Sequence, residues 1–434
     1  MKPAKTFRYP WWLETLAAVG AAALIAGMVT LFSSAGRRPG RLWATQAAPV
    51  DSQEFLSSVS GAAGAALRRG GTAQLLNNGS QFFPSMLQAI RGAQRSVNFS
   101  AYIWEKGQVS DQMLAAFLER ARAGVEVRIL LDGMGGMKAP SMDPLKAAGG
   151  KVVTFRPARF GKFTSFHKRN HRRAIVIDGA VAFTGGAAVA DQWLGDAANE
   201  EQWRDTMVRV TGPLAATLQS AFVDVWAAAC GEILEGPQFF PQETNAAAGT
   251  GAMIHTGVAS TPASDLHPLR LFLAQSFLSA QRKLYIATPY FVLDEEMRDA
   301  VAQRARAGVD VRILLPDEHT DAKLIRLTSH HYYEDLLAAG VKIYEYQPTM
   351  MHAKTIVVDG KWSVVGSANM DVRSIELNVE NVLGILDQGF GATMEKTFND
   401  DLKRSEQVRL EEWRRRGPWE KVKERLASLL AEQY

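Results

Sequence analysis

Two stretches of the sequence repeat each other almost residue for residue. One reads Glu119-Arg-Ala-Arg-Ala-Gly-Val-Glu-Val-Arg-Ile-Leu-Leu131, and the other reads Gln303-Arg-Ala-Arg-Ala-Gly-Val-Asp-Val-Arg-Ile-Leu-Leu315. Shorter echoes flank them: Ala-Gln-Arg occurs at 93–95 and 280–282, and Ala-Ala-Gly occurs at 147–149 and 338–340. Self-similarity at a separation of about 180 residues indicates two copies of one unit that is too long for a solenoid repeat.

The second copy contains the most informative pattern of the chain. It reads His352-Ala-Lys354, then Asp359, then Gly366-Ser367-Ala-Asn369. The apolar run 355–358 predicts a buried strand, and side chains two positions apart on a strand point to the same face. His352 and Lys354 can therefore converge on one group. With nearby hydroxyl and amide donors they suit a phosphate diester, because an imidazole can attack phosphorus or protonate the leaving group.

The first copy carries a related pattern at the matching place. It reads His171-Arg-Arg173, then Asp178, then Gly185-Gly186-Ala-Ala188. One half-site from each copy would supply two imidazoles for a two-step displacement at phosphorus. One imidazole would form a phosphohistidine, while the other would protonate the leaving alkoxide and then deprotonate the acceptor alcohol. This chemistry needs no cofactor and no metal, and the sequence shows no cluster of metal ligands.

The motifs resemble those of the phospholipase D superfamily and, within it, the bacterial cardiolipin synthases. The likeness covers roughly residues 75 to 434. It rests on Phe82-Phe-Pro84, Tyr102-Ile-Trp-Glu105, Asn170-His-Arg172, Phe183-Thr-Gly-Gly186, Trp203-Arg-Asp-Thr206, and Arg373-Ser374 through Asn378 to Glu380. The resemblance implies a fold of two tandem α/β domains that form one shared active-site cleft. It also implies phosphatidyl transfer through a phosphohistidine.

The same resemblance implies a role for each candidate residue. His171 would be the nucleophile and His352 the general acid and base, while Arg173 and Lys354 would hold the phosphate. Substrate binding would involve Ser367, Asn369, Gly185 and Gly186. The motif aspartates, Asp178 and Asp359, would complete the catalytic motifs as structural supports at strand ends. Asp205 and Glu380 follow their histidines at comparable distances, and each would orient an imidazole through its far nitrogen. A surface salt bridge is the alternative for both carboxylates.

The first motif departs from the family pattern at two positions. Arg173 stands where the family has lysine, and Ala188 stands where it has asparagine. Arginine keeps the positive charge, but its planar guanidinium is larger and binds phosphate differently. Ala188 removes a hydrogen-bonding side chain. A degenerate first half-site that only binds lipid therefore remains an alternative.

Composition bounds the class of protein. A chain of 434 residues with 47% hydrophobic and 22% charged residues is globular, and its length allows two or three domains. The net charge of +4 does not require a nucleic-acid partner. Cys230 is the single cysteine, so the chain cannot form an intramolecular disulfide.

The ends of the chain suggest contact with a membrane. Residues 16–32 are apolar and just long enough to cross a bilayer, so residues 1–35 are expected to be an anchor, or a signal peptide cleaved near residue 35. Residues 36–74 are expected to be a linker, 75–244 the first domain and 253–405 the second. Residues 406–434 are expected to contain an amphipathic helix, which would lie on the bilayer or cap the domain. Its stripe comprises Trp419, Val422, Leu426, Leu429 and Leu430.

One loop differs between the copies. Residues 159–169 are basic and aromatic, they precede His171, and the second copy has no equivalent. The loop could bind an anionic lipid headgroup or the bilayer surface, or it could bind a nucleic-acid backbone. Alternatively, it is a solvated loop with its aromatic side chains packed beneath it.

The sequence therefore predicts a phosphatidyltransferase of the bacterial inner membrane with a single N-terminal anchor. By its resemblance to the family it would make cardiolipin from phosphatidylglycerol. Its partners would be an anionic phospholipid and the membrane, and no nucleic acid is expected. A phospholipase D-type hydrolase of lipid or nucleic acid is one alternative, because the sequence does not distinguish water from alcohol as acceptor. A lipid-binding protein with a degenerate site is another. The oligomeric state stays open.

Overall fold

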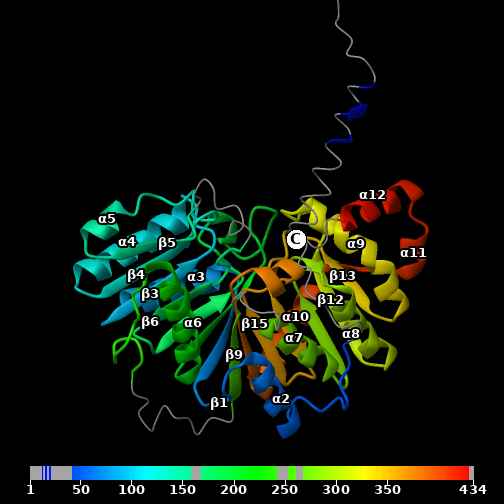
Figure 1. Cartoon of the computed structure of the whole chain (residues 1–434), viewed down its shortest axis with the longest axis horizontal. Coiled ribbons are helices and arrows are strands. Elements are labelled where there is room, and N and C mark those ends of the chain that lie inside the picture. The colour runs from blue at the N-terminus through cyan, green and yellow to red at the C-terminus, as the bar shows by residue number, and fades with distance from the viewer. Residues whose placement is uncertain are drawn as a thin grey trace, which may run out of the picture.

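The computed structural model describes residues 42–157, 168–241, 253–260 and 267–429, together with a few positions between 12 and 20. In this part of the chain two α/β domains stand side by side, each built on a mixed sheet (Figure 1). The prediction of two tandem α/β domains is confirmed.

The first domain is built on seven strands in the order β2-β8-β7-β6-β3-β4-β5. Their bounds are β2 (Thr72–Asn77), β3 (Ser96–Ala101), β4 (Glu126–Asp132), β5 (Lys151–Phe155), β6 (Ala174–Ile177), β7 (Val181–Gly185) and β8 (Thr206–Thr211). β3, β4 and β5 are parallel, whereas β6, β7 and β8 are joined in antiparallel pairs. The helices are α3 (Asn78–Arg91), α4 (Gln108–Arg122), α5 (Asp143–Ala147) and α6 (Pro213–Cys230).

The second domain repeats this topology. Its sheet has the order β1-β9-β17-β15-β14-β10-β12-β13-β18, in which β9 to β13 take the places of β2 to β5, while β1 and β18 extend the two edges. The strands are β1 (Arg68–Arg69), β9 (Ile254–Ser260), β10 (Lys283–Ala287), β12 (Asp310–Pro316), β13 (Lys342–Tyr346), β14 (Thr355–Val358), β15 (Trp362–Gly366), β17 (Glu380–Leu386) and β18 (Ser405–Val408). β11 (Phe291–Val292) and β16 (Met370–Asp371) form a separate small pair. The helices are α7 (Pro268–Leu278), α8 (Glu295–Arg306), α9 (Lys323–Ala338) and α10 (Gln388–Leu402).

The two domains share a hydrophobic core. Val208 of β8 and Leu214 of α6 belong to one buried cluster with Leu383 of β17 and Phe390 of α10. In addition, α6 of the first domain contacts β9 of the second, and α10 of the second domain contacts β2 of the first. Burial of apolar surface between the domains fixes their relative position, on which any site built from both depends.

The interval 36–74, expected to be a linker, is folded over its described part. It contains α2 (Gln53–Ala63), in which Ser52 caps the helix by accepting a hydrogen bond from the Phe55 N–H at 3.2 Å. Phe55 and Val59 are buried in the core of the second domain. The rings of Phe55 and Trp362 form a T-shaped pair there, with their centroids 5.2 Å apart. The i, i+4 spacing of these two residues gives an apolar helix face, a signal that the small-residue composition obscured.

The C-terminal region forms more than the one expected helix. β18 pairs with β13, and α11 (Leu410–Arg414) and α12 (Pro418–Ser428) then pack against α9 (Figure 1). The predicted anchor and the loop 159–169 lie mostly outside the described residues. Among the residues that are described, no helix is both long and apolar enough to span a bilayer.

Candidate active site

The two motifs lie at equivalent places in the sheets. His171 and Arg173 directly precede β6, and His352 and Lys354 directly precede β14, the middle strand of each sheet. The antiparallel partners β7 and β15 end in the Gly-rich turns, which therefore lie beside the histidine segments. The apolar run 355–358, predicted to be a buried strand, is β14.

Each histidine segment forms a short backbone bridge with the opposite domain. The His171 N–H donates to the Val379 carbonyl at 2.9 Å, and the His352 N–H donates to the Arg204 carbonyl at 2.7 Å. Val379 and Arg204 immediately precede the two predicted orienting carboxylates. As a result, each carboxylate lies next to the histidine of the other domain.

The two carboxylates contact the Nδ1 atoms of the imidazoles. Asp205 Oδ2 lies 2.6 Å from His352 Nδ1 in a hydrogen bond. Glu380 Oε1 lies 2.9 Å from His171 Nδ1, in a contact that is less well aligned than the pair of Asp205 and His352. Both carboxylates are fully buried. A carboxylate at Nδ1 holds the proton on that nitrogen and leaves Nε2 free to act. The crossing between domains was not predicted from the sequence.

The cations of the motifs lie against the imidazoles. Arg173 Nη2 is 3.2 Å from His171 Nε2, and Lys354 Nζ is 3.2 Å from both ring nitrogens of His352. Arg173 Nε and Nη1 are buried and have no hydrogen-bond partner in the described part of the chain. Buried donors of this kind suit an anionic ligand that accepts several hydrogen bonds.

Burial and these cations determine the protonation of the site. Burial lowers the pKa of His171, and Arg173 and Lys354 act in the same direction against the charge of Glu380. Burial and Lys354 lower the pKa of His352 to about 3. Burial and the charge of Arg173 also lower the pKa of Lys354, to about 7. Both imidazoles are therefore neutral at pH 7. The two half-sites are also coupled, because Lys354 lowers the pKa of His171 and Arg173 lowers the pKa of Lys354.

Gly186 and Ser367 occupy equivalent turn positions but have different surroundings. A Cβ on Gly186 would come 2.3 Å from an oxygen of Asp205, so the carboxylate fills the space that a side chain would need. Ser367 donates its hydroxyl to Glu380. Asp205 instead accepts a hydrogen bond from Trp193 Nε1 at 2.7 Å. Ser367 contacts the Glu380 carboxylate because Glu380 lies within reach of its short side chain. The expected contact of Ser367 with substrate stays a prediction.

The other turn residues also lie beside the motifs. Gly185 has a φ of 153°, and a Cβ there would meet the Thr206 carbonyl oxygen at 2.3 Å, so β8 can approach only a glycine. Asn369 is buried, and its Oδ1 has no partner among the described residues. Ala188, at the equivalent place, lines a cavity of about 20 Å³ together with Arg173 and apolar side chains. The first half-site is therefore less polar than the second.

Asp178 and Asp359 lie at the far ends of β6 and β14, away from the histidines. Both follow the strand with left-handed φ values of 54° and 55°. Their carboxylates accept backbone N–H groups of residues 94–96 and 281–283 at 2.7 to 3.0 Å. These contacts hold the starts of β3 and β10, so the structure does not bring the two aspartates together with the other catalytic candidates.

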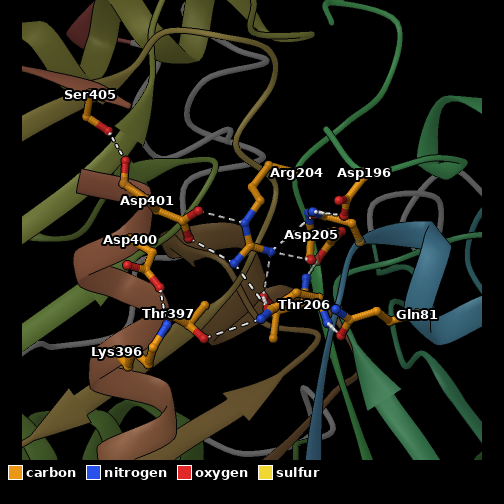
Figure 2. Close-up of polar contacts among 12 residues, drawn as sticks. Gln81, Asp196, Arg204, Asp205, Thr206, Lys396, Thr397, Asp400, Asp401 and Ser405 are labelled. Carbon is orange, nitrogen blue, oxygen red and sulfur yellow. Dashed lines mark hydrogen bonds and ion pairs between the residues drawn. The ribbon is translucent and has the colours of Figure 1, made fainter. Parts of the chain in front are cut away.

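Two arginines that were not singled out in the sequence join the domains next to the site. Arg204 binds both carboxylate oxygens of Asp401 on α10 at 2.8 Å, and Figure 2 shows its guanidinium between Asp401 and Thr206. Arg172 donates to the Ala221 carbonyl of α6 and to the Glu380 carbonyl. Each arginine is adjacent to a predicted site residue, which was the available signal.

Aromatic rings were also missed as part of the site. Trp193 and Trp203 flank the His352 ring, with centroid distances of 5.2 and 5.3 Å. Tyr102 lies against the His171 ring at 4.7 Å. These rings restrict the orientation of both imidazoles and exclude water from one side of each.

Known proteins provide an independent comparison. The model of the family described as cardiolipin synthase, phospholipase D-like domain, matches residues 86–226 and 273–402. Cardiolipin synthase 1 of Bacillus anthracis is 33% identical over 83% of this chain and 72% of its own length. A cardiolipin synthase of Clostridium perfringens (strain SM101) is 36% identical over 80% of this chain and 74% of its own length.

A solved structure supports the same fold. The crystal structure of phosphatidylserine synthase from Haemophilus influenzae covers 88% of this chain and 99% of its own, with a TM-score of 0.67. At 15% sequence identity this likeness shows the fold alone. The match of the family model to both copies, together with the identity to the relatives, shows that the chain belongs to the cardiolipin synthase family of phospholipase D-like proteins.

Proposed function

We propose that the protein makes cardiolipin by transferring a phosphatidyl group from one phosphatidylglycerol to another, with release of glycerol. The observation that carries the proposal is the pair of buried imidazoles, each held at Nδ1 by a carboxylate from the opposite domain. The identity with cardiolipin synthases supports this choice of donor and acceptor.

In the first step, Nε2 of neutral His171 attacks phosphorus. The bond between phosphorus and the headgroup glycerol oxygen breaks, and His352 supplies the proton that this oxygen needs. A bound phosphodiester brings negative charge close to His352, which raises the pKa of the imidazole and allows it to carry that proton. Arg173 and Lys354 stabilise the charge that builds up on the phosphoryl oxygens.

In the second step, His352 accepts a proton from the glycerol hydroxyl of a second phosphatidylglycerol. The resulting oxygen attacks phosphorus, and the bond between phosphorus and His171 breaks. Both histidines return to their starting states, and the products are cardiolipin and glycerol. Water in place of the second lipid would give phosphatidic acid by the same route.

The proposed place of action is the bacterial inner membrane, to which a single N-terminal anchor in residues 1–35 would attach the protein. The donor and acceptor lipids then come from the bilayer surface. The apolar character of residues 16–32 supports this part of the proposal.

The test is incubation of the full-length protein in detergent micelles with labelled phosphatidylglycerol, beside the His171→Ala variant. Separation of products by mass should give cardiolipin and glycerol, both lost in the variant. Phosphatidic acid as the main product would move the assignment to a hydrolase. No product with phosphatidylglycerol, while vesicles that contain it still bind the protein, would favour the degenerate-site alternative.

A further inference from the structure

The helix α12 exposes the face that a surface helix normally buries. Trp419, Leu426 and Leu429 are 69%, 60% and 71% exposed, and Val422 is 44% exposed. At 100° per residue these four side chains share an arc of about 80°. The two buried residues of the helix, Glu424 and Ala427, are on the opposite side.

Polar contacts hold α12 on the second domain. The carboxylate of Glu424, 4% exposed, contacts Arg416 at 2.5 and 3.1 Å and lies 3.7 Å from Nδ1 of His330 on α9. Lys421 and Arg414 both pair with Glu334 of α9. Ion pairs therefore hold the inward side of the helix, where Glu424 is buried, and the apolar stripe is left outward, the reverse of the usual arrangement.

Cations border the exposed stripe on both sides. On the helical wheel Lys423 lies on one flank and Lys421 and Arg425 lie on the other, and all three are exposed. An apolar stripe with a tryptophan at one end and basic residues along both edges matches the boundary between anionic headgroups and acyl chains.

The position of α12 connects it to the active site. The helix packs along α9 at the upper right of Figure 1. α9 begins two residues after Asp321, which accepts a hydrogen bond from Tyr290 at 2.7 Å. Tyr290 in turn lies close enough to Arg173 to affect its pKa. The contacts of α12 are with His330 and Glu334, nearer the other end of α9. Contact of α12 with a bilayer would hold the second domain at the membrane surface, which is the source of lipid substrate.

We propose that α12 is an interfacial helix that docks on an anionic bilayer, with Trp419, Val422, Leu426 and Leu429 inserted among the lipids. The proposal goes beyond the proposed function, since it rests on the surface of the helix and not on turnover.

The test uses the full-length protein reconstituted into vesicles of phosphatidylcholine with or without phosphatidylserine, which is not the proposed donor lipid. In a Cys230→Ser background, Leu426→Cys carries an environment-sensitive fluorophore. The matched control is Ile233→Cys, whose residue is 68% exposed and follows α6 of the other domain. Lipids with a shallow spin label should quench the probe at 426 but not the probe at 233, and more strongly in anionic vesicles.

Charge provides the second measurement. Neutralising Lys421, Lys423 and Arg425 to glutamine should lower the docking equilibrium constant about fivefold for each cation removed. Equal quenching at 426 and 233 would overturn the proposal. A spectral shift at 426 without lipid quenching would also overturn it, in favour of contact with a second copy or another protein. Because turnover is not the readout, this outcome is independent of whether the protein makes cardiolipin.

Discussion

The two half-sites share one backbone design and differ in their side chains. In the second-domain half, His352 is paired with Lys354, hydrogen-bonded to Asp205 at 2.6 Å and enclosed by two tryptophans. In the first-domain half, His171 is paired with Arg173 and has a less well aligned contact with Glu380. Duplication explains the common backbone. The different surroundings are consistent with the different roles proposed for the two imidazoles.

The donors to the two carboxylates also differ. Glu380 is supported by the hydroxyl of Ser367, which sits in the turn of its own domain. Asp205 is supported by the indole of Trp193, because Gly186 leaves the turn without a side chain. A buried carboxylate needs hydrogen-bond donors, and in the two half-sites these donors come from different residues at different positions.

The largest expected effect comes from removing either imidazole. His171→Ala and His352→Ala should each reduce transfer by about 10⁴-fold or more. A phosphatidyl ester with a leaving group that needs no proton should still form phosphohistidine in His352→Ala, but not in His171→Ala. Trapping by acid quench and mass spectrometry measures this difference. The reverse pattern would exchange the proposed roles.

Replacing the orienting carboxylates should have the next largest effect. Asp205→Asn and Glu380→Gln should lower kcat by about 10² to 10⁴, because each amide favours the wrong imidazole tautomer. We expect the larger loss for Asp205→Asn, since its contact is the shorter and better aligned. Thermal unfolding of each variant provides the control for folding. Near-normal turnover in either variant would contradict the crossed pairing as a functional feature.

The pH profile should report Lys354. Its pKa is lowered to about 7, so the ammonium that holds the phosphate is present below pH 7 and is lost above it. The kcat/KM of the free enzyme should therefore fall by about tenfold per unit at higher pH. Lys354→Arg should move this fall upward, because a guanidinium keeps its charge. A profile that is flat between neutral and alkaline pH would argue against the shifted lysine.

Removing the donors to the carboxylates should have a smaller effect. Ser367→Ala and Trp193→Phe should each lower kcat by about tenfold, as expected for loss of one hydrogen bond to a charged group. Each variant should leave KM almost unchanged if the residue acts through its carboxylate. A rise in KM alone for Ser367→Ala would instead support the expectation that Ser367 binds substrate.

The smallest effect is expected where the chain departs from its family. Arg173→Lys keeps the positive charge and should change kcat/KM by less than about tenfold. Arg173→Gln is the matched variant without charge and should lose far more. If Arg173→Lys were as damaging as Arg173→Gln, the bidentate shape of arginine, and not its charge, would be the property that the first half-site requires.

Much of the fold and the site could be predicted from the sequence because the signals are local. The repeat at 119–131 and 303–315 indicated two copies of one unit. The spacing of His352 and Lys354 before an apolar run predicted that their side chains converge, and they lie 3.2 Å apart, although both residues precede β14 and are not part of it. α2 was missed because its few apolar residues lie among small ones. Trp203 stands in a quoted motif and Trp193 does not, but the sequence does not reveal that either ring lies against His352.

Sequence alone determined the repeat, the two motifs and the candidate carboxylates, since these depend on residue type and on spacing within one strand or turn. Only the tertiary structure decided that Asp205 contacts His352 and that Glu380 contacts His171. This pairing depends on the shared core and on backbone bridges between segments about 150 to 200 residues apart. The tertiary structure also decided that the apolar stripe of α12 faces outward. Periodicity gives a helix two faces, but the ion pairs of Glu424 determine which face is buried.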